Sequence, residues 1–316
     1  MEHRLSLERI QHATTVIDPI FLHTSQFLAE SLSEALQAQI LVKIETMNPN
    51  RSFKGRGADY FVASLASDAR LICASAGNFG QAMAFACRNR GIPLTVYASA
   101  NANPLKLDRM RALGAQVVLH GDDFDAAKLE AKHVAQEAGL QIVEDGLEPR
   151  ISEGAGTIGL ELAQSGEPVD ALLIPLGNGA MLGGVARWIK HVWPRTQIIA
   201  VQVSGAPSMI DSWRQGRVIV HPHVETIADG IAVRVPIPEA VHDMEGLVDD
   251  AMLVQDASLI EAMRLAHRHL GIVLEPAGAA GVAALLEARG RFAGQTVATV
   301  LCGGNLTPEQ MRLWLA

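Results

Sequence analysis

Several kinds of signal are missing from this sequence of 316 residues. Lysine and arginine form no run long enough to attract a phosphate backbone or an anionic lipid surface, and the net charge is −8. No apolar stretch approaches the roughly 20 residues that a membrane-spanning helix needs. The N-terminal residues Met1-Glu2-His3-Arg4 lead into polar sequence rather than the apolar region of a signal peptide, and the three cysteines form no CxxC pair. We therefore expect a cytoplasmic protein with reduced thiols that binds neither nucleic acid nor membranes.

Motifs of several enzyme classes are also missing. The chain has neither the GxSxG elbow of serine hydrolases nor a Walker A loop. Two histidine pairs, His221 with His223 and His267 with His269, lack the HExxH pattern or a cysteine partner, so we interpret them as surface residues rather than metal ligands. The composition, 49% hydrophobic and 19% charged, is that of a globular enzyme.

Short β-rich runs alternate with helical patterns over most of the chain, which is typical of βα units and a parallel sheet. The predicted strands cover residues 71–74, 94–98, 116–119, 140–143, 171–174, 198–203 and 296–301. The predicted helices begin at Pro104, run up to Trp193, and cover residues 123–138, 256–270 and 277–288. The sequence thus predicts an α/β protein.

Three loops with glycine lie where ligands collect in such a sheet, between a strand's carboxyl end and a helix N-terminus. They begin at Ser75, Gly177 and Cys302. The loop from Gly177 offers successive backbone N–H groups, which suit one dianionic phosphate. Its glycines lack the GxGxxG spacing of a dinucleotide site, and no carboxylate follows the next strand to bind a ribose. A cofactor with a single phosphate explains the loop, and so does a tight turn.

Lys54 follows Asn, Pro and Ser residues that predict a turn entering a helix. The positive helix end and neighbouring Arg56 favour the neutral amine that a Schiff-base lysine requires. A solvated surface lysine is the alternative, and the position of Lys54 alone does not exclude it.

Four segments, in this order, resemble the fold type II pyridoxal-phosphate (PLP) enzymes, specifically the serine/threonine dehydratase and serine racemase branch. The segments are Ser52-Phe53-Lys54 with Arg56-Gly57-Ala58, Ser75-Ala76-Gly77-Asn78-Phe79-Gly80-Gln81, residues 175–184, and Leu301-Cys302-Gly303-Gly304-Asn305. They resemble the PLP-lysine motif, the loop for substrate carboxylate and ring, the phosphate cup, and the segment at the pyridine nitrogen. Residues 156–159, 226–230 and 275–278 are further family-like stretches, so the resemblance covers most of the chain.

The resemblance implies an α/β fold of the tryptophan synthase β type, with two open twisted sheets flanked by helices and PLP in the interdomain cleft. It implies a large PLP-binding domain of residues 1–64 plus 149–316 and a small mobile domain of residues 65–148 that closes on the substrate. A homodimer is implied as well. Because the chain ends soon after Cys302, we expect no appended regulatory domain.

The resemblance also implies roles for individual residues. Lys54 would hold PLP as a Schiff base and remove the Cα proton of a small amino-acid substrate. The implied cofactor contacts are Phe53, Lys54, Asn78, Gly177, Asn178, Gly179, Ala180, Met181, Gly230, Glu275 and Cys302. The implied substrate contacts are Ser75, Ala76, Gly77, Asn78 and Phe79. The thiol of Cys302 cannot keep the pyridine nitrogen protonated as a carboxylate would, which favours prompt loss of a β-leaving group.

The activity implied is β-elimination of L-threonine, L-serine or a related β-hydroxy amino acid to a 2-keto acid and ammonia. An ammonia lyase or a β-replacement enzyme acting on a modified serine, such as diaminopropionate, hydroxyaspartate or acetylserine, is an alternative. A non-catalytic protein that binds a small ligand on the same fold is another, because fold does not fix function.

Four positions depart from the family pattern. Ala76 stands where racemases of this branch carry a serine, so we expect elimination without efficient racemisation. The carboxylates of the family's divalent-metal site are missing from residues 202–208, so we expect no metal requirement. Phe79 replaces a usual histidine, and Glu153 a small residue. Glu153 is either a substrate contact that assists departure of the leaving group or a solvated carboxylate at a helix start.

Overall fold

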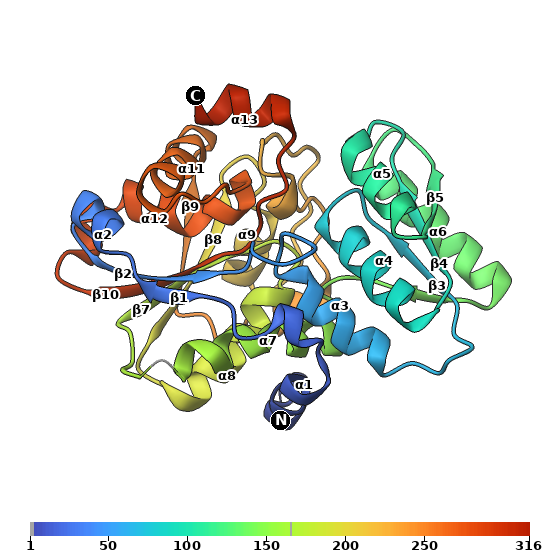
Figure 1. The fold of residues 1–316 in the computed structure, drawn as a ribbon, viewed down its shortest axis with the longest axis horizontal. Helices are drawn as coiled ribbons and strands as arrows, with labels where there is room; N and C mark the ends of the chain where they lie inside the picture. The colour runs from blue at the N-terminus through green and yellow to red at the C-terminus, as the bar shows by residue number, and fades with distance from the viewer. Residues whose placement is uncertain (1–2, 165) are drawn as a thin grey trace.

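The computed structural model describes residues 3–164 and 166–316 as two β-sheets flanked by helices (Figure 1). The strands are β1 Gln26–Leu28, β2 Gln39–Ile44, β3 Leu71–Ala74, β4 Leu94–Ala98, β5 Gln116–Leu119, β6 Gln141–Val143, β7 Ala171–Pro175, β8 Gln197–Val203, β9 Asp250–Val254 and β10 Thr296–Leu301. One sheet has the order β1-β2-β10-β7-β8-β9, and the other the order β5-β4-β3-β6. Neighbouring strands run parallel except at the edge, where β1 pairs with β2 antiparallel.

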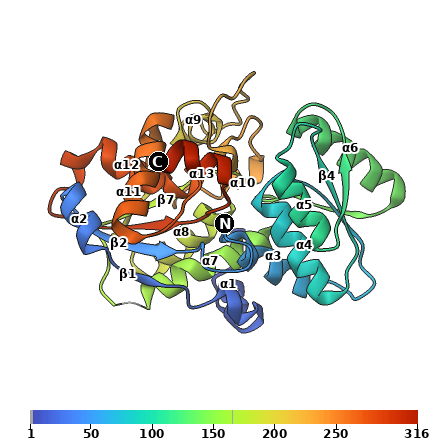
Figure 2. The same ribbon diagram turned by 45° about the horizontal axis from the view of Figure 1, so that its top comes forward.

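Helices cover both sheets. The α-helices are α1 Leu7–Val16, α2 Glu30–Leu36, α3 Lys54–Ala63, α4 Asn78–Arg90, α5 Pro104–Ala112, α6 Phe124–Ala138, α7 Pro149–Ala163, α8 Ala180–Val192, α9 Ser208–Gln215, α10 Pro238–His242, α11 Asp256–Leu270, α12 Ala280–Glu287 and α13 Pro308–Leu315. Short 3-10 helices cover Pro19–Phe21, Asp229–Ile231, Pro276–Ala279 and Arg289–Phe292. Each sheet and the helices that cover it form one lobe of the molecule. Figure 2 shows α4, α5 and α6 gathered around the smaller sheet, and α3 between the two lobes.

Successive side chains of the buried strands point to opposite faces of the larger sheet, so an apolar core forms on each face. In β7, Leu173 packs in the cluster that includes α11 and α12, whereas Leu172 and Ile174 pack in the cluster that includes α7 and α8. The smaller sheet is covered in the same way. Cys73 packs with residues of α4, and Ile72 with residues of α6. Both sheets are therefore covered on two faces, and functional groups gather at the strand ends.

The predicted strands and helices agree well with these elements. Four predicted strands, at residues 71–74, 94–98, 116–119 and 296–301, match residue for residue. The helix predicted at 277–288 instead begins as a 3-10 turn before α12. The edge strands β1 and β9, and also β2, were not predicted. In β2 the buried Lys43 interrupts an apolar run, because it is paired with a carboxylate that the sequence does not identify.

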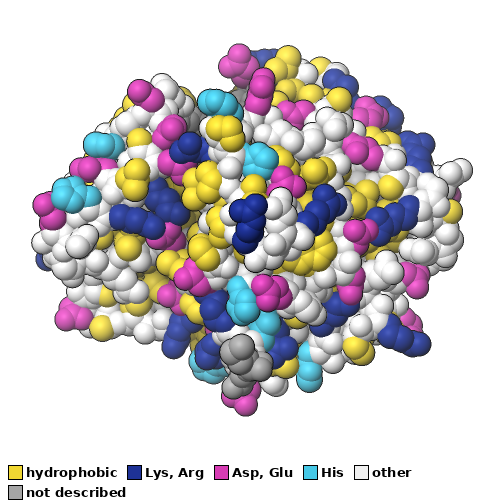
Figure 3. All heavy atoms as spheres, turned by 180° about the vertical axis from the view of Figure 1, so that it is seen from behind, with side chains coloured by type: hydrophobic (Ala, Val, Ile, Leu, Met, Phe, Trp, Pro, Cys, Tyr) yellow, Lys and Arg dark blue, Asp and Glu magenta, His cyan; other side chains and the backbone are white. Residues whose placement is uncertain are grey.

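The surface carries charges of both signs. In Figure 3, which shows the molecule from behind, Lys and Arg side chains alternate with Asp and Glu. No helix among residues 3–164 and 166–316 is long and apolar enough to cross a membrane.

Candidate active site

A cavity of about 730 Å³ lies where loops of the two lobes face each other. The loop after β3 contributes residues from Ser75 to Phe79, and the loop after β7 contributes residues from Gly177 to Leu182. Lys54 at the start of α3 and Cys302 after β10 also line it. The three loops predicted at strand ends thus meet in one place. Those after β7 and β10 follow neighbouring parallel strands of the larger sheet, and the loop after β3 reaches them from the smaller sheet.

Lys54 is the first residue of α3, and its side chain turns into the cavity with only 15% of its surface exposed. Its Nζ donates a hydrogen bond to Asp145 Oδ2 at 2.5 Å and lies 4.6 Å from the centroid of the Phe53 ring. Lys54 is therefore a cavity residue and not a solvated surface lysine. An amine in this position can hold an aldehyde cofactor and move a proton.

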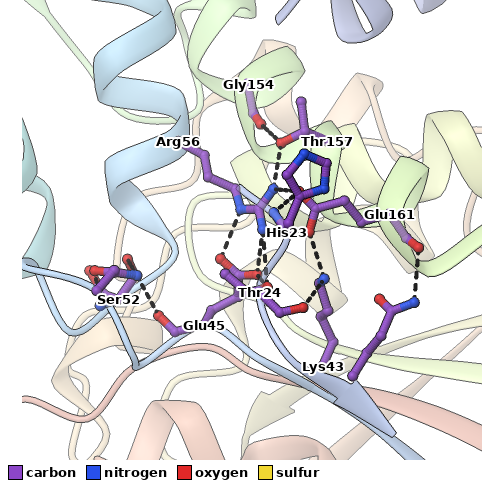
Figure 4. A network of polar contacts seen from close by, with 11 residues as sticks. His23, Thr24, Lys43, Glu45, Ser52, Arg56, Gly154, Thr157 and Glu161 are labelled. Carbon is purple, nitrogen blue, oxygen red and sulfur yellow. Dashed lines mark hydrogen bonds and ion pairs between the residues drawn. The ribbon is translucent and has the colours of Figure 1, made fainter. Parts of the chain in front are cut away.

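Arg56 does not act on Lys54 as predicted from the sequence. Its fully buried guanidinium donates to Glu45, Glu161 and Thr157 (Figure 4), and Arg56 is absent from the cavity wall. Residues two apart on a helix do not share a face, which explains the correction. Lys43 joins the network through a 2.6 Å contact with Glu161.

This network fixes the helix that carries Lys54. Burial by itself raises the pKa of Glu161, but hydrogen bonds from Arg56 and the charges of Arg56 and Lys43 outweigh it and lower the pKa to about 2. The ion pairs among Arg56, Lys43, Glu45 and Glu161 tie α3 to β2 and α7. These contacts therefore hold the helix that begins at Lys54 against the larger sheet.

The loop from Gly177 to Met181 forms a cradle that suits a phosphate. A Cβ on Gly177 would lie 2.7 Å from the carbonyl oxygen of Gly230, so the backbones approach too closely for a side chain. Gly179 has φ +88° and is the N-cap of α8, where no side chain caps the helix. The positive end of a helix of 13 residues and its first N–H groups can therefore receive an anion. A cofactor with one phosphate fits this cradle.

Asn78 and Glu275 form a polar wall of the cavity. Asn78 Nδ2 donates to Glu275 Oε1 at 2.5 Å, and Asn78 Oδ1 accepts from Asn305 Nδ2 at 2.9 Å. Burial raises the pKa of Glu275 to about 7, against the opposing charge of Lys106. A Cβ on Gly303 would lie 2.1 Å from Glu275 Oε1, so glycine is required beside this carboxyl group.

The loop from Ser75 to Phe79 enters α4 with its N-terminus directed at the cavity. Ser75 Oγ accepts hydrogen bonds from the N–H groups of Gly77 at 3.2 Å and Gly80 at 2.9 Å, which fixes the turn. Gly77 is the N-cap of α4, and no side chain caps this helix either. Ala76 and Phe79 line the cavity and supply no proton. The uncapped helix end suits a substrate carboxylate.

Cys302 presents a neutral thiol to the cavity. The side chain is buried, and its Sγ contacts the carbonyl oxygen of Ala277 at 3.7 Å. Burial raises the pKa of this thiol well above its ordinary value, and the charge of Glu275 adds to the effect. Cys302 can therefore offer a weak hydrogen bond but no negative charge.

Glu153 is the predicted site residue that the structure places elsewhere. It lies in α7, fully buried, and its carboxylate accepts hydrogen bonds from the backbone N–H of Ser6 at 2.9 Å and from Arg9 Nε. It is absent from the cavity wall, so it neither contacts the substrate nor sits solvated at a helix start. Its partners lie near the N-terminus, more than 140 residues away in the sequence, which is why the local pattern misled.

Several charged cavity residues were missed from the sequence, namely Lys106, Asp125, Lys128, Glu144, Asp145, Asp229 and Arg234. For Asp145 a signal existed, since a carboxylate followed by a glycine directly after a strand is placed at the ligand-binding edge.

The region expected to lack a metal site holds Gln202 and Ser204, which contact Ile210 and Gln255. In the described part of the chain, no three acidic, histidine or cysteine side chains are grouped to hold a metal ion.

Comparison with known proteins identifies the class of enzyme. Residues 19–303 match the family of pyridoxal-phosphate dependent enzymes. The L-threonine ammonia-lyase of Thermotoga maritima is 34% identical over 305 residues, covering 96% of this chain and 76% of that protein. The L-threonine ammonia-lyase of Geobacter sulfurreducens is 35% identical over 301 residues, covering 94% and 75%. The structure of processed threonine deaminase isoform 2 from Solanum lycopersicum is 28% identical with a TM-score of 0.89, covering 99% and 90%.

The fold and the cavity define a fold type II PLP enzyme. The chain belongs to the pyridoxal-phosphate dependent enzyme family and, within it, to the serine/threonine dehydratases. Its cofactor is PLP, which agrees with an amine, a glycine cradle and a buried thiol around one cavity. The fold expected from the sequence resemblance is thereby confirmed.

Proposed function

We propose that this enzyme catalyses β-elimination from a 2-amino acid such as L-threonine or L-serine and yields a 2-keto acid and ammonia. The observation that carries the proposal is the placement of the Lys54 amine in the same cavity as the uncapped N-termini of α4 and α8. One anion site serves the cofactor phosphate and the other the substrate carboxylate. The names of the relatives, L-threonine ammonia-lyase and threonine deaminase, agree with this activity.

Each residue has a task in the proposed reaction. PLP, when bound, supplies the sink for the electrons released at Cα. Lys54 holds the cofactor and takes the Cα proton, and the residues from Gly177 to Met181, with Gly230 behind them, bind the phosphate. Phe53, Asn78, Glu275 and Cys302 surround the ring. Ser75, Gly77 and the first turn of α4 bind the substrate carboxylate, while Ala76 and Phe79 exclude water beside it.

The Cα proton passes to Lys54 Nζ, and the Cβ–O bond breaks with its electron pair on oxygen, which leaves as water after taking up a proton. The unsaturated amino acid that remains tautomerises and is hydrolysed to the 2-keto acid and ammonia. Ala76 cannot deliver a proton to the opposite face of Cα, so the enzyme eliminates without racemising efficiently.

The arrangement of the sheets supports a division into domains. We propose that residues 65–148, which contain the smaller sheet, move as a unit and close on the substrate carboxylate. Residues 1–64 and 149–316 then form the PLP-binding domain. A homodimer in the cytoplasm, with serine as an additional substrate, completes the proposal.

The first experiment asks whether Lys54 carries the cofactor. Purified protein is expected to be yellow, and borohydride reduction followed by peptide mass spectrometry should find PLP on Lys54. With L-threonine the holoenzyme should form 2-oxobutanoate, measured with a keto-acid reagent, and Lys54→Ala should lose this activity at least about 1000-fold. A colourless protein that binds an amino acid in calorimetry without turnover would support the non-catalytic alternative. Sulfide-dependent cysteine formation from acetylserine would support β-replacement.

A further inference from the structure

Asp145 is a buried carboxylate that faces the reacting end of Lys54. It follows β6, lines the cavity, and has 8% of its surface exposed. Its Oδ2 accepts the 2.5 Å hydrogen bond from Lys54 Nζ. Its Oδ1 is buried and has no hydrogen-bond partner among the described residues. A buried carboxylate oxygen without a donor is costly, so this atom points to a ligand.

Among the other acidic side chains of the cavity, Glu275 likewise has a buried oxygen, Oε2, without a hydrogen-bond partner in the described chain, but it contacts Asn78 and not Lys54. Three others form ion pairs elsewhere. Asp125 is paired with Arg234, Asp229 with Lys106, and Glu144 with Lys128 and Lys132. None of these contacts involves Lys54. Within the part of the chain that the structure describes, the one ion pair of Asp145 is with the lysine that takes the cofactor.

Cofactor binding changes the surroundings of Asp145. A free lysine ammonium has three N–H groups, whereas an Nζ bonded to the cofactor keeps at most one. Oδ2 of Asp145 then has at most one N–H of Lys54 to accept from, and Oδ1 still lacks a donor. A carboxylate so placed requires a new cationic or hydrogen-bonding partner, and the substrate is the molecule that enters this space.

The backbone holds Asp145 in place. The next residue, Gly146, has φ +89°, and a Cβ there would lie 2.3 Å from the carbonyl oxygen of Asn178 in the phosphate cradle. The Gly146 carbonyl oxygen also accepts a hydrogen bond of 3.1 Å from Arg4. Both contacts are made by Gly146 and hold the backbone directly after Asp145.

We infer that Asp145 binds a positively charged substituent on Cβ of the substrate, so that the preferred substrates are 2-amino acids with a second ammonium group, as in 2,3-diaminopropionate. The inference rests on the proposed function and narrows its substrate class. The α-amine of the substrate must reach the place of Lys54 Nζ, which lies 2.5 Å from Asp145 Oδ2. Only two carbon atoms separate the amines of a 2,3-diamino acid, so the second ammonium lies within reach of Asp145.

The chemistry of the leaving group agrees with a carboxylate at this position. An ammonium on Cβ departs as ammonia when the Cβ–N bond breaks with its electron pair on nitrogen, and it needs no added proton. The same unsaturated amino acid remains, and one water converts it to the 2-keto acid and a second ammonia. A β-carboxylate, as in 3-hydroxyaspartate, is repelled by Asp145.

The test compares kcat/KM of the holoenzyme for L-2,3-diaminopropionate, L-serine and 3-hydroxyaspartate. Wild type should prefer diaminopropionate to serine and use hydroxyaspartate least. Asp145→Asn should lower the ratio of kcat/KM for diaminopropionate over serine by about 10- to 100-fold, the range for a lost hydrogen bond to a charged group. Asp108→Asn is the matched control, because it makes the same substitution in the smaller lobe at an exposed residue that pairs with Arg111 and does not line the cavity. Its ratio should stay within about 3-fold of wild type.

Two outcomes overturn the inference. One is a wild-type enzyme that prefers serine to diaminopropionate, and this measurement decides even if Asp145→Asn fails to bind PLP, which the absorbance spectrum reveals. The other is an Asp145→Asn variant that retains PLP and an unchanged ratio. Failure of the proposed function gives a different result, namely bound PLP without 2-keto acid from any of the three substrates.

Discussion

Glu161→Gln tests the buried network beneath Lys54. The four side chains Arg56, Lys43, Glu45 and Glu161 carry two positive and two negative charges, and each is at most 5% exposed. The substitution leaves one positive charge uncompensated in the interior. The pKa of Glu161 is about 2 against an ordinary 4.5, which corresponds to about 3 kcal/mol at about 1.4 kcal/mol for each factor of ten. We expect a loss of about 3 kcal/mol in the free energy of unfolding at pH 7, similar to losses on breaking other buried ion pairs.

The free energy of unfolding should also depend on pH in a direction that follows from the lowered pKa of Glu161. A carboxyl group with a depressed pKa contributes its stabilisation above about pH 4.5 and loses it as the pH falls through about 2. Wild type should therefore lose more stability than Glu161→Gln between about pH 5 and 2. The free energies of unfolding of wild type and Glu161→Gln are measured by urea unfolding, monitored by circular dichroism, with both proteins at equal PLP saturation. Glu137→Gln, whose carboxylate is 68% exposed beside His133, should change stability by less than about 0.5 kcal/mol. Two results would refute the reasoning. One is a loss of less than about 1 kcal/mol in the free energy of unfolding of Glu161→Gln at pH 7, and the other is a variant that loses as much stability as wild type between about pH 5 and 2.

Three further predictions concern the cavity and the cysteines. Gly177→Ala places a Cβ 2.7 Å from the Gly230 oxygen and should weaken PLP binding at least about 10-fold in a spectroscopic titration, whereas Gly290→Ala, in open space, should not. Burial raises the pKa of the thiols of Cys73, Cys87 and Cys302, so iodoacetamide at pH 8 should label them only after denaturation; rapid labelling of native protein would contradict this. Activity should survive EDTA, and a loss restored by Mg²⁺ would show a metal requirement.

The sequence was sufficient for features that depend on local pattern. The strands before Ser75, Gly177 and Cys302 are short and apolar, and each is followed by glycine. Because parallel strands of one sheet end at the same edge, the sequence could place each loop at a ligand-binding edge, although the meeting of the Ser75 loop with the other two depends on how the two sheets pack. The placement of Lys54 at a helix start followed in the same way from the turn residues before it.

Features that depend on contacts between distant segments could not be predicted. Glu153 is bound by Arg9, and Arg56 by Glu161, through contacts that span more than 100 residues. A carboxylate or a guanidinium that is buried against such a partner has the same local sequence as a solvated one. The position of Asp145 shortly after a strand gave a signal, but its contact with Lys54, 91 residues away in the sequence, could not be predicted.

The contact between Gly146 and Asn178 also limits how the lobes can rotate. The chain leaves the smaller sheet at Val143 and is already held against the phosphate cradle at Gly146. The closure proposed for the smaller lobe would therefore act on the chain between Val143 and Gly146, where Asp145 lies beside Lys54. Substrate charge and lobe closure would be sensed by the same side chain.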